Sequence, residues 1–403
     1  MVKVLHFADL HLGVENYGRL DAATGLHTRL LDFLRSFDEL VEYALQERVD
    51  LVLFAGDAYK NRDPNPTHQR EFARRIHRLA AANIPVFLLT GNHDIPSTMG
   101  RANTLDIFAT LEVPNVYVGR KLASHLIQTR SGPLQIVALP WILRSHLLSR
   151  DEYKNCTLAE LEEFTIAAVE KHLLETVATL DPHVPTILTA HGSVQGAVYG
   201  SERSVMLGHD IVLPRNLLTN QTFDYVALGH IHRHQELARN PPIVYSGSLD
   251  RVDFGEEKED KGFVVAQVER GQAHYQFVKL TSTRRFVTIE VQADGVDPMV
   301  QVREAIARHE FQEAIVRLII HTTAEKNHLL NDNEIHSLLD KAFKVAAIVR
   351  DIRRESRLRL GPNQNIEQMT PLEVLQKYLQ ARQVDKQRVE KLLEYAQRVI
   401  GDT

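Results

Sequence analysis

The sequence predicts a layered α/β protein, and two observations carry this prediction. Short apolar runs of strand length alternate with longer amphipathic stretches from residue 1 to about residue 275. These runs are almost continuously apolar, which is typical of strands buried on both faces of a sheet, whereas regular alternation would indicate a half-exposed sheet. Strands of this kind need helices on the outer faces, so a layered α/β domain follows.

The elements of this region can be taken in order. We expect strands at the apolar runs Val2–Phe7, Leu51–Ala55, Val86–Leu89, Val116–Gly119, Leu134–Leu139, Thr186–Ala190, Tyr225–Leu228, Ile243–Tyr245 and Gly262–Glu269. We expect helices at the amphipathic stretches His27–Glu47, Thr67–Ala82, Ala102–Leu111 and Ala159–Leu180. The third of these helices is either an ordinary surface helix or a contact for a partner subunit.

After Thr281 the pattern changes to a second, smaller βαβαβ domain. Its strands and helices are expected, in order, at Arg285–Gln292, Met299–His309, Ala314–His321, Asn333–Phe343 and Val345–Asp351. The end of this domain is basic, because the stretch Lys341–Arg359 holds seven Lys or Arg against two Asp or Glu. Such a run is often a solvated face, and the alternative is a contact with a DNA backbone through Arg350, Arg353 and Arg354.

A helical pair is predicted at the end of the sequence. The polar stretch before it contains Gly361-Pro362, which breaks regular structure and indicates a linker. Thr370 has the side chain of an N-cap and is followed by the first helix, Pro371–Arg382, and then by a second, Asp385–Ile400. The pair either docks on a partner or packs on its own chain.

Composition sets the broad class. The chain has 403 residues, 44% of them hydrophobic and 25% charged, which is ordinary for a globular protein of two or three domains. The predicted boundaries are residues 1–278, 282–358, 359–369 and 370–403. A net charge of -5 excludes a chain that is basic throughout but allows a local basic face. The single cysteine, the lack of a signal-peptide pattern and the lack of a long apolar run predict a cytoplasmic protein with no membrane span.

Five of the apolar runs end in His, Asp or Asn next to a glycine. The five motifs are Asp9-Leu10-His11, Gly56-Asp57, Gly91-Asn92-His93-Asp94, His191-Gly192 and Gly229-His230-Ile231-His232. Residues two apart on an extended chain point to the same side, so the pairs in the first and last motifs can each share a ligand. The carboxyl ends of strands in α/β sheets form the crevice where ligands bind. Each motif alone fits an ordinary turn, but five in succession indicate one common site.

Seven side chains in these motifs are potential metal ligands: Asp9, His11, Asp57, Asn92, His191, His230 and His232. Seven donors with one bridging carboxylate suit two ions with about four protein ligands each, which leaves positions for water and substrate. Oxygen and nitrogen donors without thiolate favour Mn²⁺, with Mg²⁺ as the alternative, over structural Zn²⁺. Two ions roughly 3.5–4 Å apart can activate a water and neutralise a phosphate, so a phosphoesterase is expected.

The five motifs in this order resemble the signature of the calcineurin-like metallophosphoesterases. Within that family the chain is similar to SbcD-type nuclease subunits and their archaeal and eukaryotic break-repair counterparts. The similarity lies in Phe7–Gly13, Asp224–His232, Tyr245–Ser248, Phe254–Glu256 and Lys261–Phe263. It implies a four-layer αββα core, a cap domain that contacts DNA, a homodimer formed through the helices near Thr67–Ala82 and Ala102–Leu111, and a terminal helical pair that docks on an SbcC-type, SMC-like ATPase.

The resemblance also implies a role for each site residue. It places Asp9, His11, Asp57 and His232 on one metal, and Asp57, Asn92, His191 and His230 on the second. His93 is then expected to stabilise the transition state and to help protonate the leaving 3′ oxygen. Archaeal and eukaryotic relatives carry another histidine three residues after the bridging aspartate, where this chain has Lys60. Lysine can hold a phosphate as a point charge but does not relay protons near neutral pH as imidazole does.

The resemblance implies a metal-dependent DNA nuclease that acts on DNA ends in repair, recombination and replication. Its activities would be a 3′-to-5′ exonuclease on double strands and an endonuclease on single strands and hairpins. The protein would be cytoplasmic and associated with the nucleoid. Two alternatives stay open. One is a phosphodiesterase or phosphatase that uses the same metals on small substrates. The other is a mainly architectural tether of DNA ends, which the terminal helical pair motivates.

Overall fold

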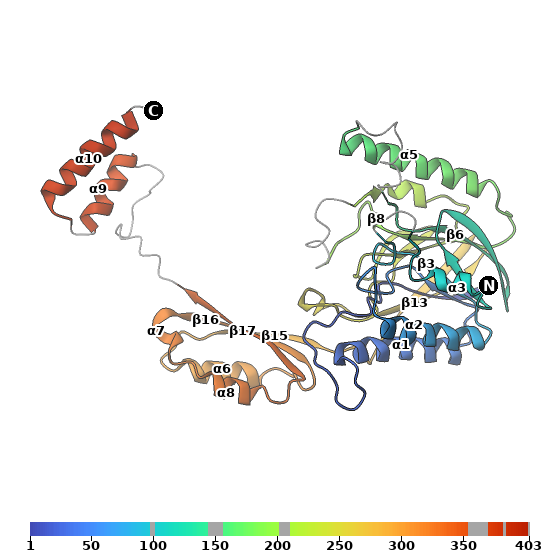
Figure 1. Ribbon diagram of the computed structural model, residues 1–403, viewed down its shortest axis with the longest axis horizontal. Helices are drawn as coiled ribbons and strands as arrows, with labels where there is room; N and C mark the ends of the chain where they lie inside the picture. The colour runs from blue at the N-terminus through green and yellow to red at the C-terminus, as the bar shows by residue number, and fades with distance from the viewer. Residues whose placement is uncertain (97–100, 144–155, 201–209, 354–369, 382–383, 402–403) are drawn as a thin grey trace. The chain divides into compact units, whose positions relative to one another are not determined.

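The computed structural model describes residues 1–96, 101–143, 156–200, 210–353, 370–381 and 384–401. The expected linker at 359–369 and Arg354 lie outside the described residues. The chain divides into two compact units, of which the first comprises Met1–Ile289, Ile306–Leu318 and His336–Ile348, and the second the remainder. Strands and helices alternate along most of the chain, so the predicted α/β class is confirmed (Figure 1).

Two six-stranded mixed sheets form the core of the first unit. The first sheet has the order β14-β13-β1-β2-β3-β4, in which β1 to β4 are parallel and β13 and β14 are antiparallel additions. Its strands are β1 Val2–Phe7, β2 Leu51–Phe54, β3 Val86–Leu89, β4 Val116–Gly119, β13 Gly262–Glu269 and β14 Gln272–Lys279. This sheet therefore brings the ends of β1, β2 and β3 to a common edge.

The second sheet has the order β11-β12-β10-β7-β6-β5, with four parallel central strands and antiparallel edges. Its strands are β5 Ala123–Thr129, β6 Gly132–Leu139, β7 Thr186–His191, β10 Tyr225–Gly229, β11 Gln235–Arg239 and β12 Pro242–Tyr245. A two-stranded sheet, β8 Ser193–Val194 with β9 Val212–Leu213, and the 3-10 turn η3 Arg215–Leu218 lie between β7 and β10 in the chain. The parallel core places the ends of β7 and β10 side by side.

Three apolar clusters define the layers of this unit. The inner cluster contains side chains from both six-stranded sheets, which therefore pack face to face. A second cluster joins the first sheet to α1 (Thr28–Gln46) and α2 (Pro66–Ala81), and a third joins the second sheet to α5 (Leu158–Val177). The order is thus helix, sheet, sheet, helix, in agreement with strands that are apolar on both faces.

One polar contact crosses the apolar layer between the two sheets. The buried His6 of β1 donates from Nε2 to the carbonyl of Leu228 at 3.2 Å, and its Nδ1 accepts from the hydroxyl of Tyr225 at 3.0 Å. Burial lowers the pKa of His6 to about 3, so the ring is neutral. Both ring nitrogens are satisfied, and His6 ties the two sheets together close to the strand ends.

Two of the predicted helices were too long. The helix expected at Ala102–Leu111 is only α3, Asp106–Thr110, because the side chain of Asn103 accepts from the N–H groups of Leu105 and Asp106 and forms a turn there.

The edge strands β5, β11 and β14 were not predicted. β5 and β14 alternate between exposed and partly buried side chains, so they lack the apolar run that marked the central strands.

The three-stranded sheet has the order β15-β16-β17, with β15 Phe286–Gln292, β16 Ile315–Thr323 and β17 Lys344–Arg353. Its helices are α6 Pro298–Ala307, α7 Ala324–Asn327 and α8 Asp332–Leu338. The helix predicted at Asn333–Phe343 was also too long, because α8 ends at Leu338. The N–H of Phe343 instead bonds to the carbonyl of Ala314, and these two residues directly precede β17 and β16. α9 (Pro371–Ala381) and α10 (Lys386–Gly401) contact each other. Thr370 and Glu373 form the predicted helix start, with reciprocal hydrogen bonds. None of the helices that the structure describes is both long enough and apolar enough to cross a bilayer.

Candidate metal centre

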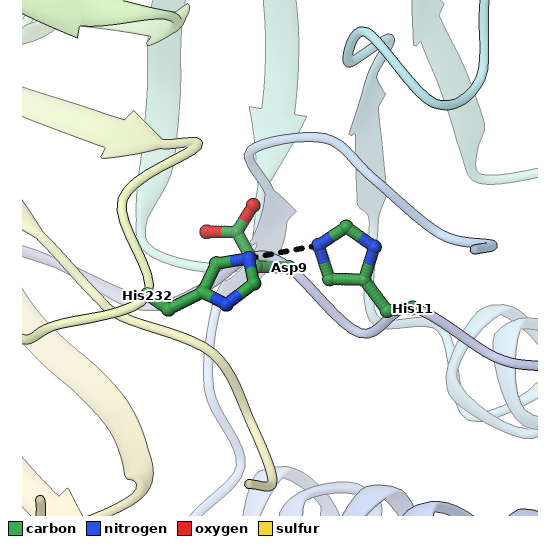
Figure 2. A group of neighbouring side chains, drawn as sticks. All are labelled: Asp9, His11 and His232. Atoms are coloured by element: carbon green, nitrogen blue, oxygen red, sulfur yellow. Dashed lines mark hydrogen bonds between the residues drawn. The ribbon is translucent and has the colours of Figure 1, made fainter. Parts of the chain in front are cut away.

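The seven predicted metal ligands lie at or just after the carboxyl ends of β1, β2 and β3 of the first sheet and of β7 and β10 of the second. The donor atoms of six of them, together with those of His93, form three overlapping groups. The groups are Asp9, His11 and His232; His11, Asp57 and His93; and Asp57, His191 and His230. Figure 2 shows the first group, in which Nε2 of His11 and Nε2 of His232 are 3.0 Å apart.

Asp57 joins these groups because its carboxylate reaches toward both sides. Its Oδ2 is 3.7 Å from Nε2 of His11 and 3.4 Å from Nε2 of His191. The amide oxygen of Asn92 lies 3.0 Å from both Nε2 of His191 and Nδ1 of His230. One carboxylate therefore faces two neighbouring sets of donors, which is the arrangement that a bridging ligand needs.

Acceptors behind the histidine rings determine which ring nitrogen faces the site. Nδ1 of His191 donates to a main-chain carbonyl at 2.7 Å, Nδ1 of His232 to Glu256 at 2.6 Å, and Nε2 of His230 to Asp210 at 3.0 Å. Carbonyl and carboxylate oxygens only accept, so these nitrogens carry protons, and the opposite nitrogen of each ring is the one that can bind a metal ion once it is deprotonated. The residues therefore fit divalent ions, with oxygen and neutral nitrogen donors and no thiolate.

The backbone at the site is strained. Asp9, His11, Asp57 and His230 all have positive φ, of 53°, 47°, 64° and 101°. Non-glycine residues rarely adopt this conformation, and it is concentrated at functional sites. Gly91 shows why a glycine stands beside the bridging aspartate, since a Cβ there would lie 2.1 Å from Oδ1 of Asp57.

Asp94 is a functional residue for which no role was predicted, although it belongs to the third motif. The side chain is buried, and it accepts from the main-chain N–H groups of Asp57 at 2.8 Å, Gly91 at 2.9 Å and Ala58 at 3.0 Å. Burial and the neighbouring Asp57 raise the pKa of Asp94 to about 6. Asp94 thus clamps the loop after β2 to the loop after β3.

The charges at the site shift the pKa values of the ligands. Burial alone would raise the pKa of Asp57, but His191 and His93 hold it well below its usual range. Burial would lower the pKa of His191, but Asp57 raises it to about 9, and Glu256 raises the pKa of His232 to about 9 against the same effect of burial. Both rings are therefore protonated near neutral pH in the metal-free protein, and a metal ion has to displace those protons.

His93 lies next to the donor groups and is partly exposed. Its main-chain N–H donates to Oδ1 of Asp57 at 2.8 Å, and its Nδ1 donates to the carbonyl of Lys60 at 2.6 Å. The ring packs edge-on against His11, with centroids 4.9 Å apart. Lys60, expected only as a phosphate contact, thus also orients His93 through its main chain. Nε of the exposed Arg62 donates to the carbonyl of Asn92 at 3.2 Å.

Further residues around the ligands were not predicted. Glu256 and the buried Lys261 contact each other at 2.9 Å, and both lie in segments that had carried the family resemblance. Asp210 and Trp141 had no such signal, because neither is part of a motif. The ring of Trp141 lies against His230, with centroids 5.0 Å apart.

The two described residues expected to contact DNA lie on β17. Arg350 forms an ion pair with Asp332 and donates to the side chain of Asn327 at 3.2 Å. Arg353 donates to the amide oxygen of Gln292 at 2.6 Å. The charge of Arg350 is therefore partly compensated, whereas the contact of Arg353 is with a neutral group.

Comparison with known proteins identifies the family of this chain. The family model for calcineurin-like phosphoesterases matches residues 2–234. The chain is 25% identical over 298 residues to the DNA double-strand break repair protein Mre11 of Thermoplasma acidophilum, covering 72% of this chain and 69% of that protein. It is 26% identical over 299 residues to the SbcD subunit of the nuclease SbcCD of Staphylococcus saprophyticus, covering 72% of each. A solved dimetal phosphatase from Danio rerio aligns with a TM-score of 0.39 and 11% identity, covering 68% of this chain and 98% of that one. Because the family match spans more than half of its length, the chain belongs to the calcineurin-like phosphoesterase family.

Proposed function

We propose that this chain is an SbcD-type DNA nuclease subunit that hydrolyses phosphodiester bonds with two divalent metal ions. The observation that carries the proposal is the position of Asp57, whose carboxylate lies within 3.7 Å of His11 and 3.4 Å of His191. One carboxylate shared between two sets of donors suits a pair of ions. The relatives, a DNA double-strand break repair protein and a nuclease subunit, support DNA over small esters as the substrate.

In this proposal the ligands divide into two sets that share Asp57. Asp9, His11 and His232 complete one set, and Asn92, His191 and His230 complete the other. Mn²⁺ is the proposed ion, because the donors are oxygen and imidazole nitrogen without thiolate. Such a pair of ions supplies a water activated for attack and neutralises charge on the phosphate.

His93 is the proposed catalytic residue outside the two ligand sets. Because Nδ1 donates to the Lys60 carbonyl, Nε2 is the nitrogen that exchanges a proton with the substrate. In its protonated form the ring can hydrogen-bond the phosphate and deliver a proton to the leaving 3′ oxygen. The hydrogen bond from the main-chain N–H of His93 to Asp57 keeps this residue next to the proposed ligands.

The remaining parts of the chain have proposed roles in assembly. Residues 282–358 would contact the DNA backbone, and among the described arginines Arg353 is the better candidate, because its contact with Gln292 is with a neutral group. Residues 370–403 would dock on an SbcC-type ATPase, and the exposed apolar side chains Tyr378, Tyr395 and Val399 on α9 and α10 support such a surface. A homodimer would form through α2 and α3.

The proposal is tested with the purified chain and end-labelled duplex and hairpin DNA in Mn²⁺ or Mg²⁺. Native protein should cut both DNAs, Asp57→Ala should lose cleavage, and His93→Gln should lose roughly 10²–10⁴-fold in rate while still binding metal. The control Glu170→Gln, on the exposed side of α5, should behave as native. Cleavage by Asp57→Ala at the native rate, or turnover of a small phosphodiester in place of DNA, would contradict the proposal.

A second experiment tests the terminal helical pair. Removal of residues 370–403 should abolish binding of the ATPase and spare basal cleavage, and loss of both would favour the architectural tether.

A further inference from the structure

We propose that Glu256 is a positioning residue for His232, and that the turn carrying it, η4 (Phe254–Glu256), is itself held by strands β15 and β16. This inference rests on the proposed metal centre, because it concerns how one of its ligands is held. It assigns a function to a buried ion pair that otherwise has none in the proposed mechanism.

The carboxylate of Glu256 is fixed through both oxygens. It is fully buried, and Oε1 accepts from Nδ1 of His232 at 2.6 Å. Oε2 faces Nζ of the buried Lys261 at 2.9 Å and accepts from the N–H of Val252 at 3.0 Å and the hydroxyl of Ser248 at 3.3 Å. With donors on both oxygens, the carboxylate has one orientation in which all of its partners are satisfied.

This orientation determines how His232 faces the metal centre. The Glu256 carboxylate can only accept, so the ring keeps a proton on Nδ1, and Nε2, which lies 3.0 Å from Nε2 of His11, is the nitrogen that faces the centre and would bind a metal ion. Nζ of Lys261 also donates to the carbonyl of His232 at 3.0 Å. Glu256 and Lys261 together therefore hold both the ring and the main chain of one ligand.

The residues on each side of Glu256 tie the turn to the three-stranded sheet. The carboxylate of Glu257 accepts from the N–H of Thr288 at 2.8 Å and from its hydroxyl at 2.5 Å. The ring of Phe254 lies under the guanidinium of Arg317, 4.4 Å from the ring centroid, and packs edge-on against Phe286 at 5.0 Å. A shift of these strands would therefore move the turn, and with it the acceptor of His232.

A conservative substitution separates positioning from packing. Glu256→Gln keeps the shape of the side chain, but an amide has only one oxygen, so it cannot accept from both His232 and the donors around Lys261. Its NH₂ group must then face a donor. Glu259→Gln is the matched control, because Glu259 accepts from Lys261 at 2.8 Å and is not among the hydrogen-bonding partners of His232.

The test is a Mn²⁺ titration of the full chain by calorimetry, with EPR to count bound ions and with thermal unfolding in chelator to verify folding. We expect two ions to bind the native protein and Glu256→Gln to weaken one of them roughly 10–100-fold. His232→Ala should affect the same ion, and Glu259→Gln should leave both unchanged. Thr288→Val, which removes only a hydroxyl, should weaken that same ion by a smaller factor.

Unchanged affinity for both ions in Glu256→Gln overturns the positioning role, as does an equal loss in Glu259→Gln. Unchanged affinity in Thr288→Val overturns the link from the turn to β15. Failure of the native protein to bind Mn²⁺ is a different outcome, because it contradicts the proposed function rather than the role of Glu256.

Discussion

A single methyl group at Gly91 is predicted to disable the metal centre without removing any ligand. In Gly91→Ala the new Cβ would lie 2.1 Å from Oδ1 and 2.6 Å from the main-chain nitrogen of Asp57. Ordinary contact begins at 3.4 Å, so the oxygen must retreat by about 1.3 Å. The main chain of Asp57 cannot follow easily, because its N–H is bound to the buried Asp94. The carboxylate therefore has to rotate and give up its bond from His93.

The expected size of this effect follows from the displacement. Misplacing a reacting or ligating group by about 1 Å costs roughly 10²-fold in rate, or about 2.7 kcal/mol. Because Asp57 faces both donor sets, both Mn²⁺ ions should bind more weakly in Gly91→Ala. Calorimetric titration with Mn²⁺ and a DNA cleavage assay measure the two quantities. Native affinity and native rate in this variant would refute the reasoning.

A matched control distinguishes this displacement from a general cost of alanine. Gly25 has a φ of 68° and open space where a Cβ would be added, so Gly25→Ala introduces backbone strain without a clash. It should cost about 1 kcal/mol of stability and leave Mn²⁺ affinity unchanged. A loss of affinity in Gly25→Ala equal to that in Gly91→Ala would show that destabilisation alone explains the result.

Four other expected outcomes follow from buried contacts and charges of the first unit. Asp94→Ala leaves three main-chain N–H groups without their acceptor, and each unmet buried donor costs roughly 1–3 kcal/mol, so urea unfolding should show a loss of stability of at least about 3 kcal/mol. Unchanged stability would contradict the clamp. The pKa values of about 9 for His191 and His232 mean that Mn²⁺ must displace protons, so the affinity for Mn²⁺ should rise between pH 7 and 9. Calorimetry in buffers of different ionisation enthalpy should detect the released protons. An affinity that does not change with pH would contradict this expectation. Since these pKa values are raised by folding, the metal-free protein should instead lose stability as pH rises from about 6.5 to about 9, which melting in chelator measures. Asp32→Ala leaves the guanidinium of the fully buried Arg29 without the carboxylate that lies 2.8 Å away, so urea unfolding should show a loss of about 3–5 kcal/mol of stability. A loss below about 1 kcal/mol would contradict a stabilising role of this ion pair.

The sequence was sufficient for those parts of the fold in which local pattern and tertiary environment agree. The central strands were predicted closely because burial on both faces requires an unbroken apolar run, as in Leu51–Phe54. The edge strand β14 was missed because one of its faces is more exposed, which breaks that run. The helix near α3 was overestimated because the side chain of Asn103 competes for the first N–H groups of the helix.

The choice of the seven candidate donors and their gathering at one place follow from the sequence alone, because parallel strands carry their carboxyl ends to one edge and five such ends carry ligand-type residues. Which ring nitrogen faces the centre was decided only by the tertiary structure, since Glu256 and Asp210 approach His232 and His230 from loops with no fixed spacing to them. The same holds for Lys60, where the sequence indicated a replaced side chain and the fold instead uses a main-chain carbonyl. A hydrogen-bond acceptor can come from any residue that the fold brings near, and for that reason the motifs predict the candidate ligands but not the groups that orient them.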